Sequence, residues 1–281
     1  VMASEVDEGF LKGGWMFDGS SIAGWKSINE SDMKLMPDLD SGYLDPFYSE
    51  KTYCLHCNVV EPESGKLYGR DPRSTAVKAE DYLKKTKIGT KAFFGPEAEF
   101  FLFDDVKFSN SMNKVSFEVD AMDASWNTDT SYEMGNMGHR PGVKGGYFPV
   151  NPTDAGQDIR SEMLSTMKRM GMKVDKHHHE VASCQHELGL VFDSLKAQGD
   201  NLQKYKYVIQ NVAHSYGKSA TFMPKPIAND NGTGMHTNMS IWDGNSPVFA
   251  GKEYAGLSKN ALYYIGGILT VSYTHLTLPT M

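Results

Sequence analysis

Three segments of the sequence combine carboxylates or imidazoles with strand-like neighbours, and their residues could perform chemistry. In PEAEFF, Glu97 and Glu99 are two positions apart, so on a strand both would project from one face. Two adjacent carboxylates repel each other unless a cation or a proton lies between them. Because the flanking phenylalanines are too apolar for an ordinary surface strand, a metal or acid–base site is favoured over a solvated face.

The second segment is KHHHEVA, in which alternation puts His178 and Glu180 on one face and His177 and His179 on the other. Three consecutive histidines are by themselves compatible with a polar sheet edge. A glutamate and a histidine that point together are, however, a reasonable pair of metal ligands. Glu187, seven residues after Glu180, could return to the same place.

The third segment is NDNGTGMHTNMSIW, where His236, Asn238 and Ser240 would share one strand face. Taken alone, a histidine such as His236 is more often structural than a ligand. The turn that contains Asn231 and Gly232 comes just before this strand, and its backbone N–H groups could hold a carboxylate or a phosphate.

These segments together suggest one divalent-metal site. Its candidate ligands are Glu97, Glu99, Glu180, Glu187 and His236. A mostly carboxylate set suits Mg²⁺ or Mn²⁺, whereas zinc would more often take cysteine or several histidines. Magnesium in proteins often works with phosphates, which indicates a nucleotide. The sequence carries none of the P-loop, Rossmann or kinase signatures, so a different fold would have to bind ATP.

The predicted secondary structure has to bring these segments together. We expect a strand over 97–103 with Pro96 at its early edge, and further strands over MKVDKHHHEVAS and TGMHTNMSIW. Helices are expected at about 154–170, at about 195–216 and from near Ser258 onward. Because strands and helices are mixed without a regular βαβ alternation, we predict an α+β fold on a mostly antiparallel sheet.

One domain boundary is expected near Asp71. The polar segment EPESGKLYGRDPR leads into a helix for which Asp71 can be the N-cap and Pro72 the first residue. The sequence thus predicts one domain over 1–70 and another over 71–270. The last segment, 271–281, is unrelated in character to the apolar helix before it and is predicted to be a non-native tail.

Composition narrows the function classes. The 281 residues carry a formal net charge of −7, which argues against a nucleic-acid partner. The sequence contains no apolar stretch that approaches a membrane span and no signal-peptide pattern at its start, so no membrane partner and a cytoplasmic location are predicted. Cys54 and Cys57 form a C-x-x-C pair that is better explained as strand residues than as a redox or zinc motif.

Six motifs then match one family. FDGSSIAGW, INESDM, FGPEAEFFLF, GHRPGVKGGYFPV, HHHEVA and KPIANDNGTGMH occur in the order seen in bacterial type I glutamine synthetases. The resemblance extends from about residue 3 to residue 269. It implies a partial β-grasp N-terminal domain and a catalytic domain with a curved antiparallel sheet and flanking helices. It also implies a homododecamer of two hexameric rings, with each active site between neighbouring subunits.

The resemblance implies a role for each candidate residue. Glu99, Glu180 and Glu187 resemble the ligands of one divalent ion, and Glu97 and His236 those of the other. Asp18 resembles the aspartate that binds and deprotonates ammonium. Asn231 and Gly232 match the glutamate-binding loop. The positions that match ATP contacts are Asp175, Asn238 and Ser240, although Asp175 and Asn238 replace a glutamate and a histidine of the enteric form.

The implied reaction is the ATP-dependent ligation of ammonia to L-glutamate through γ-glutamyl phosphate. In the family, a second half follows the segment that ends near Leu269 and supplies arginines for phosphate and glutamate. This chain is therefore expected to be a fragment that lacks both ends of the family sequence and is inactive alone.

Three alternatives to this reaction stay open. One is a ligase that joins glutamate to another amine, and another is a metal-dependent hydrolase or nuclease. The third is a non-catalytic ring-forming protein.

Overall fold

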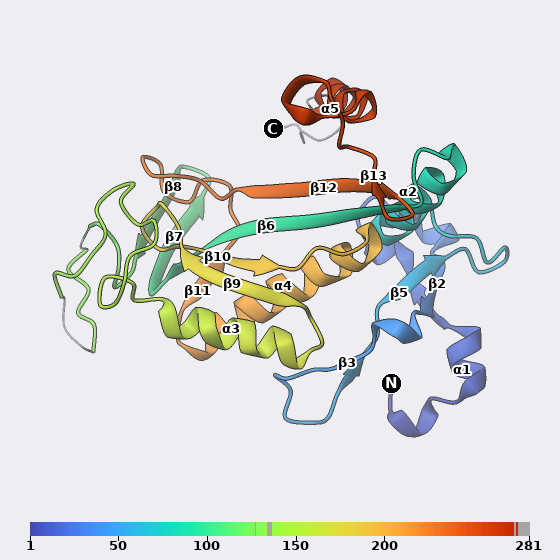
Figure 1. Ribbon diagram of the computed structural model, residues 1–281. Coiled ribbons are helices and arrows are strands. Elements are labelled where there is room, and N and C mark those ends of the chain that lie inside the picture. The colour runs from blue at the N-terminus through green and yellow to red at the C-terminus, as the bar shows by residue number, and fades with distance from the viewer. Residues whose placement is uncertain (127, 134–136, 273, 275–281) are drawn as a thin grey trace.

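A computed structural model describes residues 1–126, 128–133, 137–272 and 274 (Figure 1). The helices are α1 (Glu8–Gly13), α2 (Pro72–Thr86), α3 (Gln157–Arg169), α4 (Leu195–Ser215) and α5 (Lys259–Val271). Short 3₁₀ helices cover Ala3–Glu5, Gly19–Ser21, Ile28–Glu30, Leu39–Ser41 and Tyr254–Gly256. None of the helices in this described part is long and apolar enough to cross a membrane.

Within the described residues, the strands form four antiparallel sheets. A three-stranded N-terminal sheet has the order β1 (Trp15–Asp18), β2 (Asp32–Pro37), β5 (Cys57–Val60). The large sheet has the order β13 (Ser246–Pro247), β12 (Met235–Asp243), β6 (Lys91–Phe103), β10 (Gln185–Leu190), β9 (Val174–His179), and β11 (Ser219–Thr221) also pairs with β6. The two-stranded pairs are β3 (Tyr43–Leu44) with β4 (Tyr53–Cys54) and β7 (Asp105–Ser111) with β8 (Lys114–Asp120). Helices and antiparallel sheets thus confirm the predicted α+β fold.

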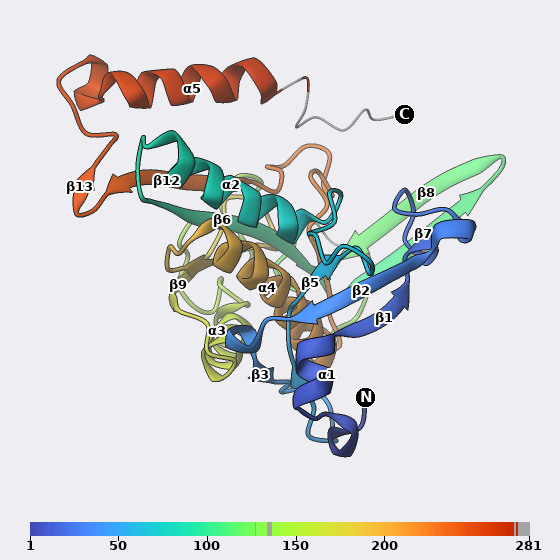
Figure 2. The same ribbon diagram turned by 90° about the vertical axis from the view of Figure 1, so that its right-hand side faces the viewer.

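Helices α3 and α4 cover one face of the large sheet (Figures 1 and 2). Alternate residues of the central strands, such as Phe100 and Leu188, pack there against Met163 of α3 and Tyr205 and Ile209 of α4, all fully buried. Because strand side chains alternate, the residues between them must point to the opposite face. Packing on the helix side therefore determines which residues the other face presents.

Strand β6 begins earlier than the sequence predicted. Pro96 was expected at its edge, but the strand starts at Lys91, and Pro96 lies inside it opposite Thr237 of β12. A proline in a sheet removes one ladder hydrogen bond. On its other side, the pairing of β6 with β10 ends at Glu99 and resumes only as a bridge between Phe94 and Asp193. Pro96 lies in that interruption, where the ladder with β10 provides no partner for a backbone N–H.

Other predicted elements are confirmed. Asp71 caps α2 through bonds from Arg73 and Ser74 backbone N–H groups, and Pro72 is its first residue. Ser258 caps α5 in the same way. Cys54 ends β4 and Cys57 begins β5, so both are strand residues as predicted, but they belong to two different sheets. The predicted tail, 271–281, lies mostly outside the described residues, apart from the end of α5 and positions 272 and 274.

Arg73 joins the N-terminal sheet to the helices. Its guanidinium donates to both carboxylate oxygens of Asp200 in α4, at 2.9 and 3.0 Å, and it also contacts Asp38 and Asn58 of the N-terminal segment. Burial alone would raise the pKa of Asp38, but the hydrogen bonds and charges of Lys196 and Arg73 outweigh it and lower this pKa to about 2. This partly buried network of charged side chains links the N-terminal segment to α2 and α4.

We expect Arg73→Ala to lower the free energy of unfolding by about 3 kcal/mol, because it leaves the Asp38 and Asp200 carboxylates partly buried without their cation. Urea unfolding of the purified chain measures the change. Lys84→Ala, on the same helix, is the control, since its pair with Asp81 is exposed and should change stability by less than about 0.5 kcal/mol. Equal stability of the two variants would contradict the role assigned to Arg73.

Candidate metal and substrate site

Strand register brings the predicted acidic residues into two neighbouring rows. In the first row, Glu187 of β10 lies opposite Glu99 of β6 and opposite His178 of β9. In the second row, His236 of β12 lies opposite Glu97 of β6. Directly opposed residues of antiparallel strands have Cβ atoms about 5 Å apart, so the side chains of each row are in reach of one another. The rows occupy the sheet face opposite to α3 and α4.

These rows form the floor of a polar cavity of about 630 Å³. All five predicted metal ligands line it, and so do both residues of the predicted glutamate loop. The lining residues are Glu97, Glu99, Tyr147, Lys176, His178, Glu180, Val181, Gln185, Glu187, Lys225, Asn231, Gly232, Gly234 and His236. The structure thus brings the predicted acidic residues together, and it adds Tyr147, Lys176, Gln185 and Lys225, which the sequence did not single out.

Hydrogen bonds fix the orientation of Glu99. Its Oε2 accepts from the backbone N–H of Gly234 at 2.8 Å and from the side-chain amide of Gln185. A Cβ on Gly234 would lie 2.8 Å from Glu99 Oε1, so a larger residue would displace the carboxylate. Gln185 also donates to the Gly232 carbonyl at 3.0 Å, which ties the loop to the same carboxylate. The feature of the sequence that could have indicated these contacts is the pair of glycines in NGTG, Gly232 and Gly234.

Glu180 is held differently, just after β9 ends. Its Oε1 lies 2.7 Å from His178 Nε2, and its Oε2 accepts from the Val181 N–H at 3.0 Å. Ligand atoms of His178, Glu180 and Glu187 all lie within 4.8 Å of one another. In the second row, His236 Nδ1 is 3.6 Å from Glu97 Oε2. Both rows thus offer clustered oxygen and nitrogen donors.

The electrostatics of the cavity are those of crowded anions. Burial raises the pKa of Glu99 and of Glu187, and the neighbouring carboxylates raise each further. For Glu180, burial would also raise the pKa, but the hydrogen bonds from His178 and Val181 outweigh it and lower the pKa overall. A bound cation would reduce the repulsion within this partly buried cluster of four carboxylates. The oxygen and imidazole ligands of the cluster fit Mg²⁺ or Mn²⁺.

A buried layer behind the sheet supports Glu180. His179 Nδ1 donates to the Glu180 carbonyl at 2.7 Å, and its Nε2 is 2.9 Å from Asp123 Oδ2. Next to it, His186 Nδ1 is 2.9 Å from Arg160 Nη1. Because arginine can only donate, this His186 nitrogen accepts, so it is the other ring nitrogen that carries the proton. The layer is therefore a hydrogen-bonded support for the strand ends, which the sequence analysis did not foresee.

Asp18 is not part of this cavity within the same chain. It lies exposed at the end of β1, in the N-terminal sheet. Its Oδ1 accepts from the Ser20 N–H at 2.8 Å and from the Ser20 hydroxyl at 2.6 Å. These bonds are the main reason that the pKa of the Asp18 carboxyl is lowered. The group is thus an anion presented to solvent.

Of the three predicted ATP contacts, Asn238 lies nearest to the acidic rows. Asn238 Nδ2 donates to Glu97 Oε1 at 3.1 Å. Ser240 lies farther along β12, and its hydroxyl accepts from Trp242 Nε1 at 3.0 Å. Asp175 is on β9, where its carboxylate lies over Gly189, and it does not line the cavity.

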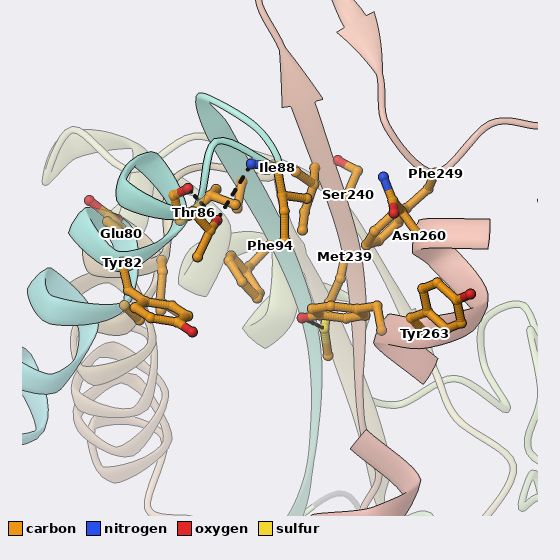
Figure 3. A pocket seen from close by; sticks show the side chains of 16 residues that line it. Glu80, Tyr82, Thr86, Ile88, Phe94, Met239, Ser240, Phe249, Asn260 and Tyr263 are labelled. Atoms are coloured by element: carbon orange, nitrogen blue, oxygen red, sulfur yellow. Dashed lines mark hydrogen bonds between the residues drawn. The ribbon is translucent and has the colours of Figure 1, made fainter. Parts of the chain in front are cut away.

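Ser240 also borders a second cleft of about 440 Å³, which is mostly apolar. Figure 3 shows this cleft between α2 and α5, with Tyr82 and Tyr263 on opposite sides of Met239. The cleft uses the sheet face that carries Phe94 and Met239, whereas the acidic rows use the other. The two hollows therefore differ in chemistry, and the carboxylates belong to the polar one.

The fold and this site together define an α+β protein with a carboxylate-rich cavity on an antiparallel sheet. Residues 69–281 match the family model described as glutamine synthetase, catalytic domain, and residues 1–62 match the one described as glutamine synthetase, beta-Grasp domain. The chain belongs to the glutamine synthetase family.

Individual relatives agree with this assignment. Glutamine synthetase of Rhodobacter capsulatus is 66% identical over 269 residues, which cover 96% of this chain and 61% of the relative. The chain thus spans about three fifths of that protein's length. Among solved structures, Plasmodium falciparum glutamine synthetase superposes with a TM-score of 0.89 at 28% identity, covering 99% of this chain and 55% of that one. A GmaS/ADP complex has a TM-score of 0.69 at 25% identity, with 92% and 53% covered.

We expect Glu187→Gln to stabilise the metal-free chain by roughly 1 kcal/mol at neutral pH. The raised pKa of Glu187 means that its ionised form is disfavoured in the fold, so a neutral isostere relieves repulsion. Urea unfolding in a chelator measures the effect. With Mn²⁺ in excess the order should reverse, because only the wild type gains the full energy of binding. Exposed Glu50→Gln is the control, and a destabilised Glu187→Gln chain without metal would contradict the repulsion.

Proposed function

We propose that this chain carries most of the metal and substrate site of a glutamine synthetase, which joins ammonia to L-glutamate at the expense of ATP. The observation that carries the proposal is the convergence of Glu97, Glu99, Glu180, Glu187 and His236 in one cavity beside the Asn231–Gly232 turn. The 66% identity to a glutamine synthetase supports the same reaction.

Two divalent ions, Mg²⁺ or Mn²⁺, fit the two rows. Glu99, Glu180 and Glu187 would hold one, and Glu97 with His236 the other. Bound ions would offset the repulsion between the glutamate carboxylate and the phosphate chain and the charge on the transferred group. The support for this assignment is the crowding of buried carboxylates, which raises the pKa of Glu99 and Glu187.

The substrates would lie around these rows. Asn231 and Gly232 would hold L-glutamate, since their loop is tied by Gln185 to the carboxylate of Glu99. ATP would lie toward Asp175, Asn238 and Ser240, and a structural relative solved as an ADP complex supports nucleotide use. The glutamate γ-carboxylate would attack the γ-phosphoryl group to give γ-glutamyl phosphate and ADP. Ammonia would then displace phosphate and leave glutamine.

Asp18 would act on ammonium in the site of a neighbouring copy. Ammonium is not a nucleophile until it loses a proton, and an exposed carboxylate can both attract it and accept the proton. The position of Asp18 outside the cavity of its own chain supports a site completed between copies.

We further propose the homododecamer of two hexameric rings that the family resemblance implies. The β7–β8 hairpin supports self-association, because it extends beyond the catalytic sheet with one apolar face (Figure 2). Phe108, Val115 and Phe117 on this face are 81%, 77% and 65% exposed. Exposed apolar surface of this kind often marks a protein–protein contact.

Several finer assignments stay predictions from the sequence. They are the domain limits at 1–70 and 71–270, the non-native tail, the cytoplasmic location and the absence of nucleic-acid or membrane partners. The start of α2 at Pro72 and the separate sheet before it support the domain boundary between residues 70 and 71.

A chimera tests the proposed reaction. Residues 1–269 of this chain would replace the matching segment of the Rhodobacter capsulatus relative, which supplies the rest of that protein's length. We expect ADP release that requires both glutamate and ammonia and yields glutamine. In the same chimera, Glu187→Gln should lower turnover by at least about a hundredfold, whereas Glu50→Gln should not. A folded chimera that hydrolyses ATP without glutamate, or does nothing, would contradict the proposal. The 281-residue chain alone is expected to be inactive.

A further inference from the structure

The edge strand of the large sheet contains a β-bulge beside the polar cavity. Along β9 and β10, His178 pairs with Glu187 and His177 with Leu188, but the next pair is Val174 with Leu190. The register therefore shifts by one residue, so that Asp175 and Lys176 both lie opposite Gly189. Such a bulge interrupts the strict alternation of side chains and can direct a neighbouring side chain to a site.

The bulge places Asp175 and Lys176 over the same residue. A Cβ on Gly189 would lie 2.0 Å from Asp175 Oδ1 and 3.1 Å from Lys176 Cγ. Gly189 is two positions after Glu187, so its Cβ direction is that of the cavity face. Regular alternation would have put Asp175 on the opposite face with His177. Glycine at position 189 thus leaves the space that both side chains occupy at the rim.

Lys176 carries a positive charge that the fold leaves available. Its side chain is exposed and lines the polar cavity together with His178 and Glu187. Within the described part of the chain, Lys176 makes no ion pair or side-chain hydrogen bond. The other lysine of the lining, Lys225, donates to the Asp230 carbonyl. If two divalent ions offset the four carboxylates, Lys176 remains to meet an anionic substrate group.

The position of Lys176 indicates which substrate it meets. Gln185, which holds the Gly232 carbonyl of the glutamate loop, and Gly189 lie four residues apart on β10. At about 3.3 Å per residue, roughly 13 Å separate the two ends of the site along this strand. Lys176 is therefore at the end opposite the glutamate loop, next to Asp175.

We propose that Lys176 binds the phosphate chain of the nucleotide and that the space above Gly189 lets its side chain lie at the rim of the cavity. The inference rests on the proposed function, because it requires a nucleotide in this cavity. A lysine ammonium is a point charge with three donors, which suits phosphate oxygens in more than one arrangement. The contact is a specificity element for phosphorylated ligands and leaves the base and ribose to other residues.

Binding measurements on the 281-residue chain test this without an activity assay. Calorimetry would give the Kd of Mg-ATP, Mg-ADP and adenosine for the wild type and for Lys176→Ala. We expect Lys176→Ala to raise the Kd of Mg-ATP about tenfold and to leave the Kd of adenosine unchanged. Lys176→Arg should retain most of the affinity for Mg-ATP. The control is Lys173→Ala, which removes an exposed lysine three residues earlier and should change the affinity for neither Mg-ATP nor adenosine.

Gly189→Ala is the second variant, because its methyl group would displace Asp175 and Lys176 from the rim. It should also weaken the binding of Mg-ATP more than that of adenosine. Cooperative urea unfolding would show that the variant is still folded. Lys176→Ala that binds Mg-ATP like the wild type would overturn the role of Lys176 and leave the proposed function standing. Equal weakening of adenosine would overturn phosphate recognition. A wild-type chain that binds none of the three ligands would overturn both proposals.

Discussion

The repulsion among buried carboxylates is the constraint on which the site depends. Glu99 and Glu187 are directly opposed on neighbouring strands, and Glu97 and Glu180 are close enough to raise the pKa of Glu187 further. Side chains placed only for stability would not gather in this way, since like charges opposed across a sheet are destabilising. The rest of the fold keeps them there: α3 and α4 pack on the opposite face, and their contacts with Phe100 and Leu188 leave Glu99 and Glu187 no other direction.

Support for the carboxylates comes both from groups behind the sheet and from the backbone that lines the cavity. The His179–Asp123 pair holds the Glu180 carbonyl, and Gly234 permits a backbone N–H to approach Glu99. A carboxylate held by such bonds keeps its orientation whether or not a cation is bound, which lowers the cost of binding one. At the rim, the absence of a side chain on Gly189 leaves space for Asp175 and Lys176, and Lys176 adds a positive charge beside the acidic rows.

Strand alternation explains how much of the site could be predicted from sequence. A period of two was enough to place Glu97 with Glu99 and to put His236 with Asn238, because these strands are regular. The same rule fails at Asp175, since the bulge adds a residue that alternation cannot anticipate. Gln185 and the His179–Asp123 pair were missed for another reason. Their importance lies in contacts between distant segments, such as the hydrogen bond between Gln185 and Glu99, which are 86 positions apart in the sequence. The error at Pro96 has the same origin, because the interrupted ladder that tolerates it is a tertiary feature.

The central claim is that the two rows of side chains hold two neighbouring divalent ions. Titration of the 281-residue chain with Mn²⁺, followed by electron paramagnetic resonance, tests it most directly. The account predicts two bound ions per chain whose spectrum is broadened by the interaction between them, because the rows are adjacent on one sheet face. A single isolated ion, or no binding stronger than that of exposed surface carboxylates, would contradict it.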